Sequence, residues 1–222
     1  MTSQVVLKQI ARSGFVPVLT IDDASHATDL AAALLDGGAT VVEVTLRTPA
    51  SVEALTAISS DTRLTVGAGT VLTREHIDDA LAAGARFIVS PGFNPDLADH
   101  CRELGVPFLP GVATASEIIR AAGAGAECVK FFPAEPLGGI NAISALAAVF
   151  PDLRFVPTGG ISAENMCRYL RQPSVAAVAG SWCASPELLS RQEWPEVTRR
   201  AAEALQIVDR ARRTDGGISS GR

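Results

Sequence analysis

Three segments of the chain share one pattern, in which a helical stretch ends at a Gly-Ala pair and an apolar run follows at once. The glycines of these pairs are Gly38, Gly84 and Gly125. They lie 46 residues (38 to 84) and 41 residues (84 to 125) apart, about twice the roughly 20 residues that a strand and its crossover helix occupy. This spacing predicts repeated βα units, and eight of them fit the 222 residues of the chain.

The apolar runs predict parallel strands, because each run is followed by a helical pattern and strands that alternate with helices pair in parallel. Eight units at this length favour a single-domain (β/α)8 TIM barrel over an open doubly wound sheet. A Gly-x-Gly at Gly67 lacks the third glycine that would open a helix, which argues against a dinucleotide site. Strands are expected near residues 15–20, 41–45, 64–67, 86–90, 107–110, 127–131, 154–157 and 175–180.

The two ends of the chain carry different patterns. Residues 3–13 predict a short amphipathic helix, ended by Gly14, that caps the fold. After the eighth strand, a helix is expected from Pro186 to about Ile207, followed by a polar, glycine-rich segment without an apolar period. We therefore expect a folded domain over residues 1–208 and a disordered tail over residues 209–222.

The composition of the chain limits which binding partners and which cellular compartment are expected for the protein. A net charge of −5 and a pI near 5.2, with no basic run in the first 200 residues, argue against nucleic-acid or membrane-surface binding. No signal-peptide core or spanning segment is recognisable, so we expect a cytoplasmic protein. The four cysteines are widely separated and the three histidines do not cluster, so neither a metal site nor another cofactor is expected.

A lysine stands inside an apolar run that otherwise predicts a buried strand, Cys128-Val-Lys130-Phe-Phe132. Burying an ammonium group is costly unless it is paired or loses its charge. A desolvated neutral amine can attack a carbonyl group and form a Schiff base. The alternative is a structural role, in which Lys130 extends its amine to water or closes an ion pair.

Side-chain alternation places three charged residues in one cavity. In the second strand, Val42, Val44 and Leu46 share the face expected under the helices, which leaves Glu43, Thr45 and Arg47 facing inward. In the sixth strand, Lys130 takes the inward position by the same alternation. A carboxylate, a guanidinium and an amine at the barrel mouth suit carbonyl chemistry on an anionic substrate. The alternative for Glu43 and Arg47 is an ion pair that plugs the barrel.

Two glycine-rich turns follow the seventh and eighth predicted strands. One contains Gly159 and Gly160, and the other contains Gly180 and Ser181. Barrels of this class often bind phosphate through backbone N–H groups at these two positions. Each turn alone is also compatible with an ordinary connection between a strand and a helix. A weaker signal, Gly67-Ala-Gly-Thr70, would deliver the Thr70 hydroxyl to the same mouth.

Seven motifs follow one another along the chain and begin at Glu43 (EVTLRT), Val66 (VGAGTV), Ser90 (SPG), Pro110 (PG), Lys130 (KFFPAE), Pro157 (PTGGI) and Gly180 (GSW). In this order they resemble the 2-keto-3-deoxy-6-phosphogluconate (KDPG) and 4-hydroxy-2-oxoglutarate (KHG) aldolases, class I aldolases of the Entner–Doudoroff pathway. The resemblance covers nearly the whole chain. One departure lies after Pro110-Gly111, where Ala113 stands in place of the expected hydroxyl residue.

The resemblance implies roles for individual residues. Lys130 would be the Schiff-base lysine and Glu43 the general acid and base. The residues that would hold the pyruvoyl end or shape its pocket are Arg47, Thr70, Pro91 and Phe132. The residues that would bind the substrate phosphate are Gly159, Gly160, Gly180 and Ser181. The resemblance also implies a homotrimer that needs no metal, with phosphorylated keto acid and pyruvate as its small-molecule partners.

Three other functions stay open at this stage. One is a 4-hydroxy-2-oxoglutarate aldolase, or a relative that acts on another 2-keto-3-deoxy sugar-acid phosphate. A second is a phosphate-binding barrel isomerase or epimerase, in which Glu43 abstracts a proton and Lys130 only stabilises an enolate. A third is a sugar-phosphate binding protein, which would not need a lysine and a glutamate that face each other. The intact glycine turns favour the phosphorylated substrate.

Overall fold

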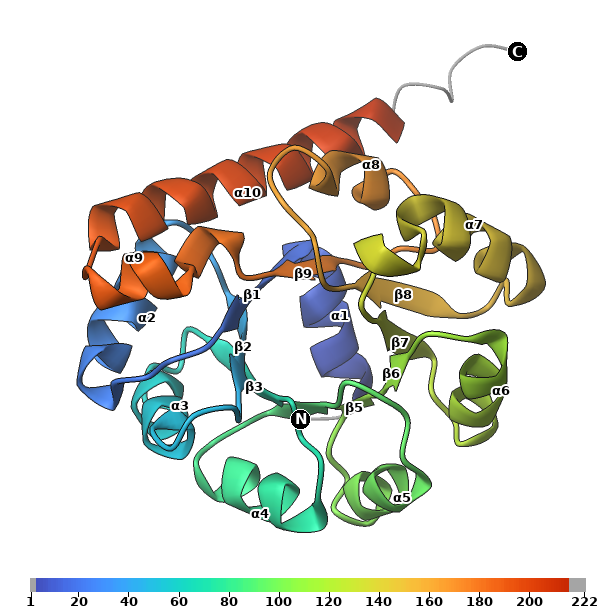
Figure 1. Ribbon diagram of the computed structural model, residues 1–222, viewed down its shortest axis with the longest axis horizontal. Coiled ribbons are helices and arrows are strands. Elements are labelled where there is room, and N and C mark those ends of the chain that lie inside the picture. The colour runs from blue at the N-terminus through green and yellow to red at the C-terminus, as the bar shows by residue number, and fades with distance from the viewer. Residues whose placement is uncertain (1–2, 216–222) are drawn as a thin grey trace.

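Parallel strands form the wall of a barrel and helices surround it in the computed structural model, which describes residues 3–215 (Figure 1). Every strand pairing among these residues is parallel. The strands are β1 (Phe15–Leu19), β2 (Val41–Thr45), β3 (Thr65–Gly69), β4 (Phe87–Val89), β5 (Phe108–Leu109), β6 (Gly111–Val112), β7 (Cys128–Phe131), β8 (Arg154–Pro157) and β9 (Val178–Gly180). The expected strands and the (β/α)8 barrel are confirmed.

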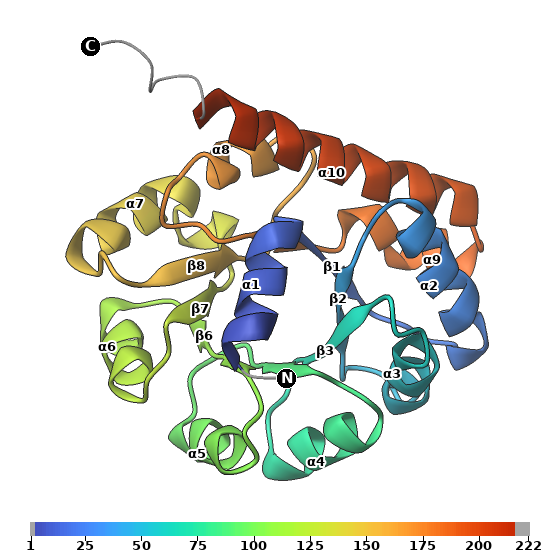
Figure 2. The same ribbon diagram turned by 180° about the vertical axis from the view of Figure 1, so that it is seen from behind.

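The helices lie outside this wall, except for α1 at one end. They are α1 (Ser3–Ser13), α2 (Ala27–Asp36), α3 (Ser51–Ser59), α4 (Arg74–Ala82), α5 (Pro95–Glu103), α6 (Ala115–Gly123), α7 (Gly139–Val149), α8 (Met166–Leu170), α9 (Pro186–Ser190) and α10 (Trp194–Asp215). Figure 2 shows α1 lying over the end of the barrel opposite to the view of Figure 1. Val6 and Ile10 on α1 are buried against the inner side chains of the strands, which confirms the predicted capping helix.

The ring of strands consists of two hydrogen-bonded runs. One run has the order β5-β4-β3-β2-β1-β9, and the other has the order β6-β7-β8. Isolated bridges between Phe155 and Val175 and between Thr158 and Ala179 join the β8 and β9 segments. On the other side, β5 lies within the fifth predicted strand, near residues 107–110, and β6 continues it beyond that range. The chain itself therefore joins the two runs there.

Pro110 explains why the fifth strand is split. It has no N–H to donate to a neighbouring strand, although its carbonyl accepts from the Lys130 N–H at 2.9 Å. β5 therefore pairs with β4, and β6 pairs with β7. A Cβ on Gly111 would lie 2.2 Å from the Pro91 carbonyl, so only glycine lets this strand run against the loop after β4.

Alternation sorts the strand residues into two apolar groups. Val42, Val44, Val129 and Phe131 belong to the large core between strands and helices. The second group fills the barrel interior together with α1. Its strand residues are Val16, Val41, Phe87, Val89, Leu109, Cys128, Val156 and Ala179, and Ala177 directly before β9 joins them. The predicted alternation in the second and sixth barrel strands, β2 and β7, is confirmed.

The C-terminal region differs from the sequence-based prediction in two respects. The single helix expected from Pro186 is two helices, α9 and α10, because Gln192 adopts a left-handed φ of 54° between them. The expected end of the folded domain at residue 208 is also wrong, since α10 continues to Asp215. Ala211 is buried, and Arg212 donates hydrogen bonds to the Ala11 and Arg12 carbonyls at the end of α1. Residues 216–222 of the predicted disordered tail lie outside the described residues.

Gly67 provides a test of the barrel interior. A Cβ at this position would lie 2.3 Å from the Phe87 ring, so Gly67→Ala forces two side chains into one space. We expect this variant to lose about 1–3 kcal/mol of stability in urea unfolding. Gly123→Ala on α6 is the control, because nothing lies within 4 Å of its Cβ. The control should gain about 0.5–1 kcal/mol. Equal stability of the two variants would contradict this packing.

Candidate active site

The amine of Lys130 and the carboxylate of Glu43 meet inside the barrel. Lys130 Nζ donates a hydrogen bond to Glu43 Oε1 at 2.9 Å, and the two side chains are only 7% and 3% exposed. The residues come from β7 and β2, which are not hydrogen-bonded neighbours. The pair therefore spans the barrel interior. Lys130 does not extend its amine to water, and its charge is compensated by one buried partner.

Both side chains are directed inward by the alternation of their strands. Val129 and Phe131 on either side of Lys130 pack into the outer core, and Cys128 below it lies in the barrel interior. Two ions removed from water lose several kcal/mol of hydration each, and their attraction compensates this only in good geometry. The pair is thus a costly feature that the surrounding apolar wall keeps in place.

Gly69 makes room for the glutamate. A Cβ at this position would lie 2.1 Å from Glu43 Oε1, so any larger residue would displace the carboxylate from Lys130. From the sequence, Gly67-Ala-Gly-Thr70 was expected only to deliver the Thr70 hydroxyl, and the role of Gly69 was not predicted. Gly67 and Gly69 share the inward parity of β3, and that spacing was the available signal.

The residues predicted for the pyruvoyl end differ in burial. Arg47 follows the same inward parity as Glu43, but it is exposed and makes no side-chain hydrogen bond or ion pair within residues 3–215. The alternative of a plugging ion pair between Glu43 and Arg47 is therefore wrong for the described structure. A guanidinium free of protein partners is available to an anionic ligand.

Phe132 lies beside the buried amine, whereas Pro91 lies on the loop after β4. The Lys130 Nζ atom is 5.5 Å from the centre of the Phe132 ring, which is 36% exposed. Pro91 is half-buried, and its carbonyl lies against the backbone of Gly111. Thr70, directly after β3, has a left-handed φ of 57°, a conformation that costs a threonine about 1–3 kcal/mol. The surrounding chain holds Thr70 in this strained position at the barrel mouth.

The glycine turn that follows β8 can form only with glycine at both of its central positions. Gly159 and Gly160 have φ angles of 97° and 78°. A Cβ on Gly160 would also lie 2.7 Å from the Cβ of Glu135. Both the positive φ and this contact therefore exclude a side chain at Gly160. Gly180 ends β9, and Ser181 is an exposed residue directly before the short helix Trp182–Ala184. The two turns lie on neighbouring segments, since the Thr158–Ala179 bridge joins them.

Two supports of the Gly159–Gly160 turn were not predicted from the sequence. Asn165 Nδ2 donates to the Gly160 carbonyl at 2.8 Å, and Asn165 Oδ1 accepts from the Ser162 N–H at 2.9 Å. On the other side, the Glu135 carboxylate accepts from the Tyr169 hydroxyl, whose pKa is raised by burial and by this carboxylate. Only the S-A-E-N spacing after the turn could have indicated these hydrogen bonds of Asn165.

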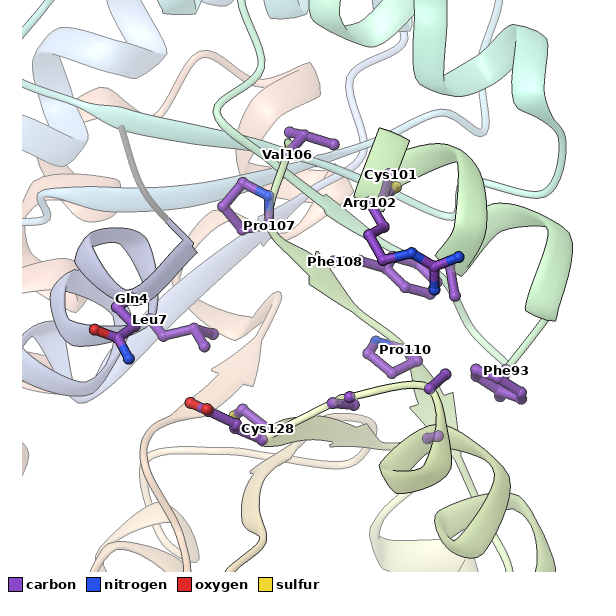
Figure 3. A pocket seen from close by; sticks show the side chains of 16 residues that line it. Gln4, Leu7, Phe93, Cys101, Arg102, Val106, Pro107, Phe108, Pro110 and Cys128 are labelled. Carbon is purple, nitrogen blue, oxygen red and sulfur yellow. The ribbon is translucent and has the colours of Figure 1, made fainter. Parts of the chain in front are cut away.

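A separate cavity of about 320 Å³ lies where β5 and β7 diverge (Figure 3). Gln4 and Leu7 of α1 lie at one end of it and Phe93 at the other. Its lining is mostly apolar, with Arg102 on α5 and Glu127 before β7 among its few polar groups. It reaches the side of the barrel that α1 covers and lacks the lysine and glutamate described above.

The four cysteines are free thiols, and burial raises the pKa of Cys128 to about 12. Within residues 3–215, no three His, Cys, Asp or Glu side chains gather as a metal site would require. No helix in the same range is both long and apolar enough to span a membrane.

A (β/α)8 barrel in which a buried lysine and glutamate face each other belongs with enzymes that use an amine as nucleophile toward a carbonyl group. Comparison with known proteins identifies the family. The family model described as Aldolase: KDPG and KHG aldolase matches residues 6–200. The chain belongs to this family of carbon–carbon lyases.

Individual relatives agree with this assignment. The chain is 45% identical over 204 residues to the 2-dehydro-3-deoxy-phosphogluconate aldolase of Treponema pallidum, covering 91% of this chain and 97% of that protein. It is 40% identical over 192 residues to the KHG/KDPG aldolase of Escherichia coli K12, covering 86% and 90%. The Legionella pneumophila KDPG aldolase, crystallised with pyruvate captured at low pH as a covalent carbinolamine, matches with a TM-score of 0.87 and 40% identity. That match covers 92% of this chain and 98% of the other.

Proposed function

We propose that the protein cleaves KDPG to pyruvate and glyceraldehyde 3-phosphate through a Schiff base on Lys130. The observation that carries this proposal is the 2.9 Å hydrogen bond between Lys130 Nζ and Glu43 Oε1 inside the barrel. The family relation supports the same reaction. The T. pallidum relative is named as a KDPG aldolase, and the E. coli relative is named as an aldolase of both KHG and KDPG.

Imine formation needs a neutral amine and a group that moves protons. The Lys130 ammonium passes a proton to Glu43 along their hydrogen bond, and the freed amine adds to the C2 carbonyl of the substrate. Glu43 returns a proton to the resulting hydroxyl group, which leaves as water. The product is a protonated imine, which draws electrons toward C2.

Cleavage and release follow from the same two residues. Glu43, now a carboxylate, takes the proton of the C4 hydroxyl group, and the C3–C4 bond breaks as the aldehyde forms. The bond electrons move into the imine and give an enamine, and glyceraldehyde 3-phosphate leaves. The enamine gains a proton at C3 and becomes the pyruvate imine. Water then hydrolyses this imine, which frees pyruvate and restores Lys130.

The ends of the substrate have separate partners in this proposal. Arg47, exposed and without a protein partner in the described chain, pairs with the C1 carboxylate, and the Thr70 hydroxyl binds beside it. Pro91 and Phe132 form the walls of the pyruvoyl pocket. The turns at Gly159, Gly160, Gly180 and Ser181 bind the phosphate through backbone N–H groups. The family relation is the support for the further proposals of a cytoplasmic location and a homotrimer.

A second activity, cleavage of 4-hydroxy-2-oxoglutarate to pyruvate and glyoxylate, uses the same lysine and glutamate. The KHG/KDPG aldolase of E. coli K12 carries both substrates in its name. An isomerase or epimerase would need no covalent bond to Lys130, and this distinguishes it from both aldolase activities.

The catalytic roles are tested by cleavage assays on purified variants. Lys130→Ala should have no measurable KDPG cleavage, because no imine can form. Glu43→Gln keeps the shape but removes the proton acceptor, and should lower kcat by about 10² or more. EDTA should not change the rate, because the imine is the electron sink in this mechanism. Cleavage by Lys130→Ala, or cleavage that stops with EDTA, would refute the proposed mechanism.

The phosphate turn is tested with Gly160→Ala. The new Cβ would meet Glu135 and strain the backbone, so KM for KDPG should rise about tenfold, while cleavage of 4-hydroxy-2-oxoglutarate should change little. Gly125→Ala is the matched control, because its φ of 91° gives the same strain but nothing lies within 4 Å of its Cβ. An equal loss on both substrates would contradict the assignment of the phosphate to this turn.

A further inference from the structure

Two threonine hydroxyl groups lie beside each other at the mouth ends of β1 and β2. Thr45 Oγ1 donates a hydrogen bond to the Leu19 carbonyl at 2.9 Å. The same oxygen lies 3.0 Å from Thr20 Oγ1. Thr45 is buried, whereas Thr20 is half-buried. These contacts form a short chain of hydrogen bonds from the half-buried Thr20 hydroxyl through Thr45 to the Leu19 carbonyl.

The direction of this chain follows from counting protons. A threonine hydroxyl group has one proton and two lone pairs. Thr45 uses its proton on the Leu19 carbonyl, so it can only accept from Thr20. The Thr20 hydroxyl therefore donates its proton to Thr45 Oγ1. What Thr20 offers to a ligand is a pair of acceptor sites and no donor.

Strand register places Thr20 next to the substrate path. Val18 lies opposite Glu43 in the pairing of β1 with β2, so Thr20 stands two residues nearer the mouth, beside Thr45. On its other edge β1 pairs with β9, with Pro17 opposite Gly180. Thr20 thus follows a strand that lies between the strand of Glu43 and the strand that leads to Ser181.

We propose that Thr20 is a specificity-determining residue whose oxygen accepts a hydrogen bond from the C5 hydroxyl group of the substrate. This inference rests on the proposed aldolase function, in which C2 is bound to Lys130 and the C6 phosphate lies at the turns after β8 and β9. C5 is the carbon that follows the C4 hydroxyl handled by Glu43. It lies between that glutamate and the phosphate site, as Thr20 does.

The same oxygen discriminates against 4-hydroxy-2-oxoglutarate. That substrate has a carboxylate at C5, which offers only acceptors and a negative charge. An oxygen restricted to accepting cannot bond to it, and two facing acceptors repel each other. Thr20 therefore favours the sugar-acid phosphate over the dicarboxylate.

Thr45 is the positioning residue of this arrangement. Thr45→Val removes the acceptor that holds the Thr20 proton, so the Thr20 hydroxyl becomes free to turn and donate. This variant should improve cleavage of the dicarboxylate relative to KDPG, although it does not alter Thr20 itself. A purely structural role of Thr45 would lower both activities together.

The experiment compares kcat/KM for KDPG and for 4-hydroxy-2-oxoglutarate in purified wild-type, Thr20→Val, Thr20→Ser and Thr45→Val proteins. Thr20→Val should lose about tenfold on KDPG and gain about threefold on 4-hydroxy-2-oxoglutarate. Thr20→Ser keeps the hydroxyl group and should restore the wild-type ratio. Thr45→Val should shift the ratio about fivefold or more toward the dicarboxylate.

The outcomes separate this inference from the function on which it rests. Absence of KDPG cleavage by the wild-type protein would refute the proposed function itself. With wild-type cleavage present, an unchanged substrate ratio in Thr20→Val would overturn the role of Thr20. Parallel losses on both substrates that Thr20→Ser does not repair would also overturn it, since they would indicate a packing defect.

Discussion

The rest of the site depends on one buried ion pair. Lys130 and Glu43 are nearly excluded from water, and each would be strongly destabilising without the other. Removing one partner of such a pair typically costs about 3–5 kcal/mol, whereas an apolar pair of the same shape is often as stable. Stability therefore gives no reason for these residue types at this place. Proton transfer between an amine and a carboxylate does, because a lysine nucleophile needs a nearby group that takes and returns its proton.

Glycine creates the space in which this chemistry occurs. Gly69 leaves room for the Glu43 carboxylate, and Gly160 lets the turn after β8 pass over Glu135. The two positions act for different reasons: the first has an ordinary strand conformation, and the second has a positive φ. In the proposed function, the packed interior holds the reacting groups and the backbone turns bind the phosphate.

The sequence was sufficient to predict the barrel, because a helix, a Gly-Ala pair and a strand recur at Gly38, Gly84 and Gly125 and alternation assigns the inner faces. The same alternation predicted that the Lys130 and Glu43 side chains face one cavity. It did not predict that Arg47 has no side-chain partner among residues 3–215, or that Gly69 leaves room for Glu43, since both depend on distances between strands. The helical end at Asp215 was missed because the contacts that hold it, through Ala211 and Arg212, are made with distant parts of the chain.

The central claim is that Lys130 becomes covalently bound to the substrate, and the composition makes a direct measurement possible. The chain contains two lysines, Lys8 and Lys130, and Lys8 is exposed on α1. The Lys8→Arg variant should be incubated with pyruvate and borohydride, digested and analysed by mass spectrometry. The account predicts one reduced pyruvate unit on the peptide that contains Lys130, and none after Lys130→Ala is added. An unmodified Lys130 in protein that still cleaves KDPG would contradict the account.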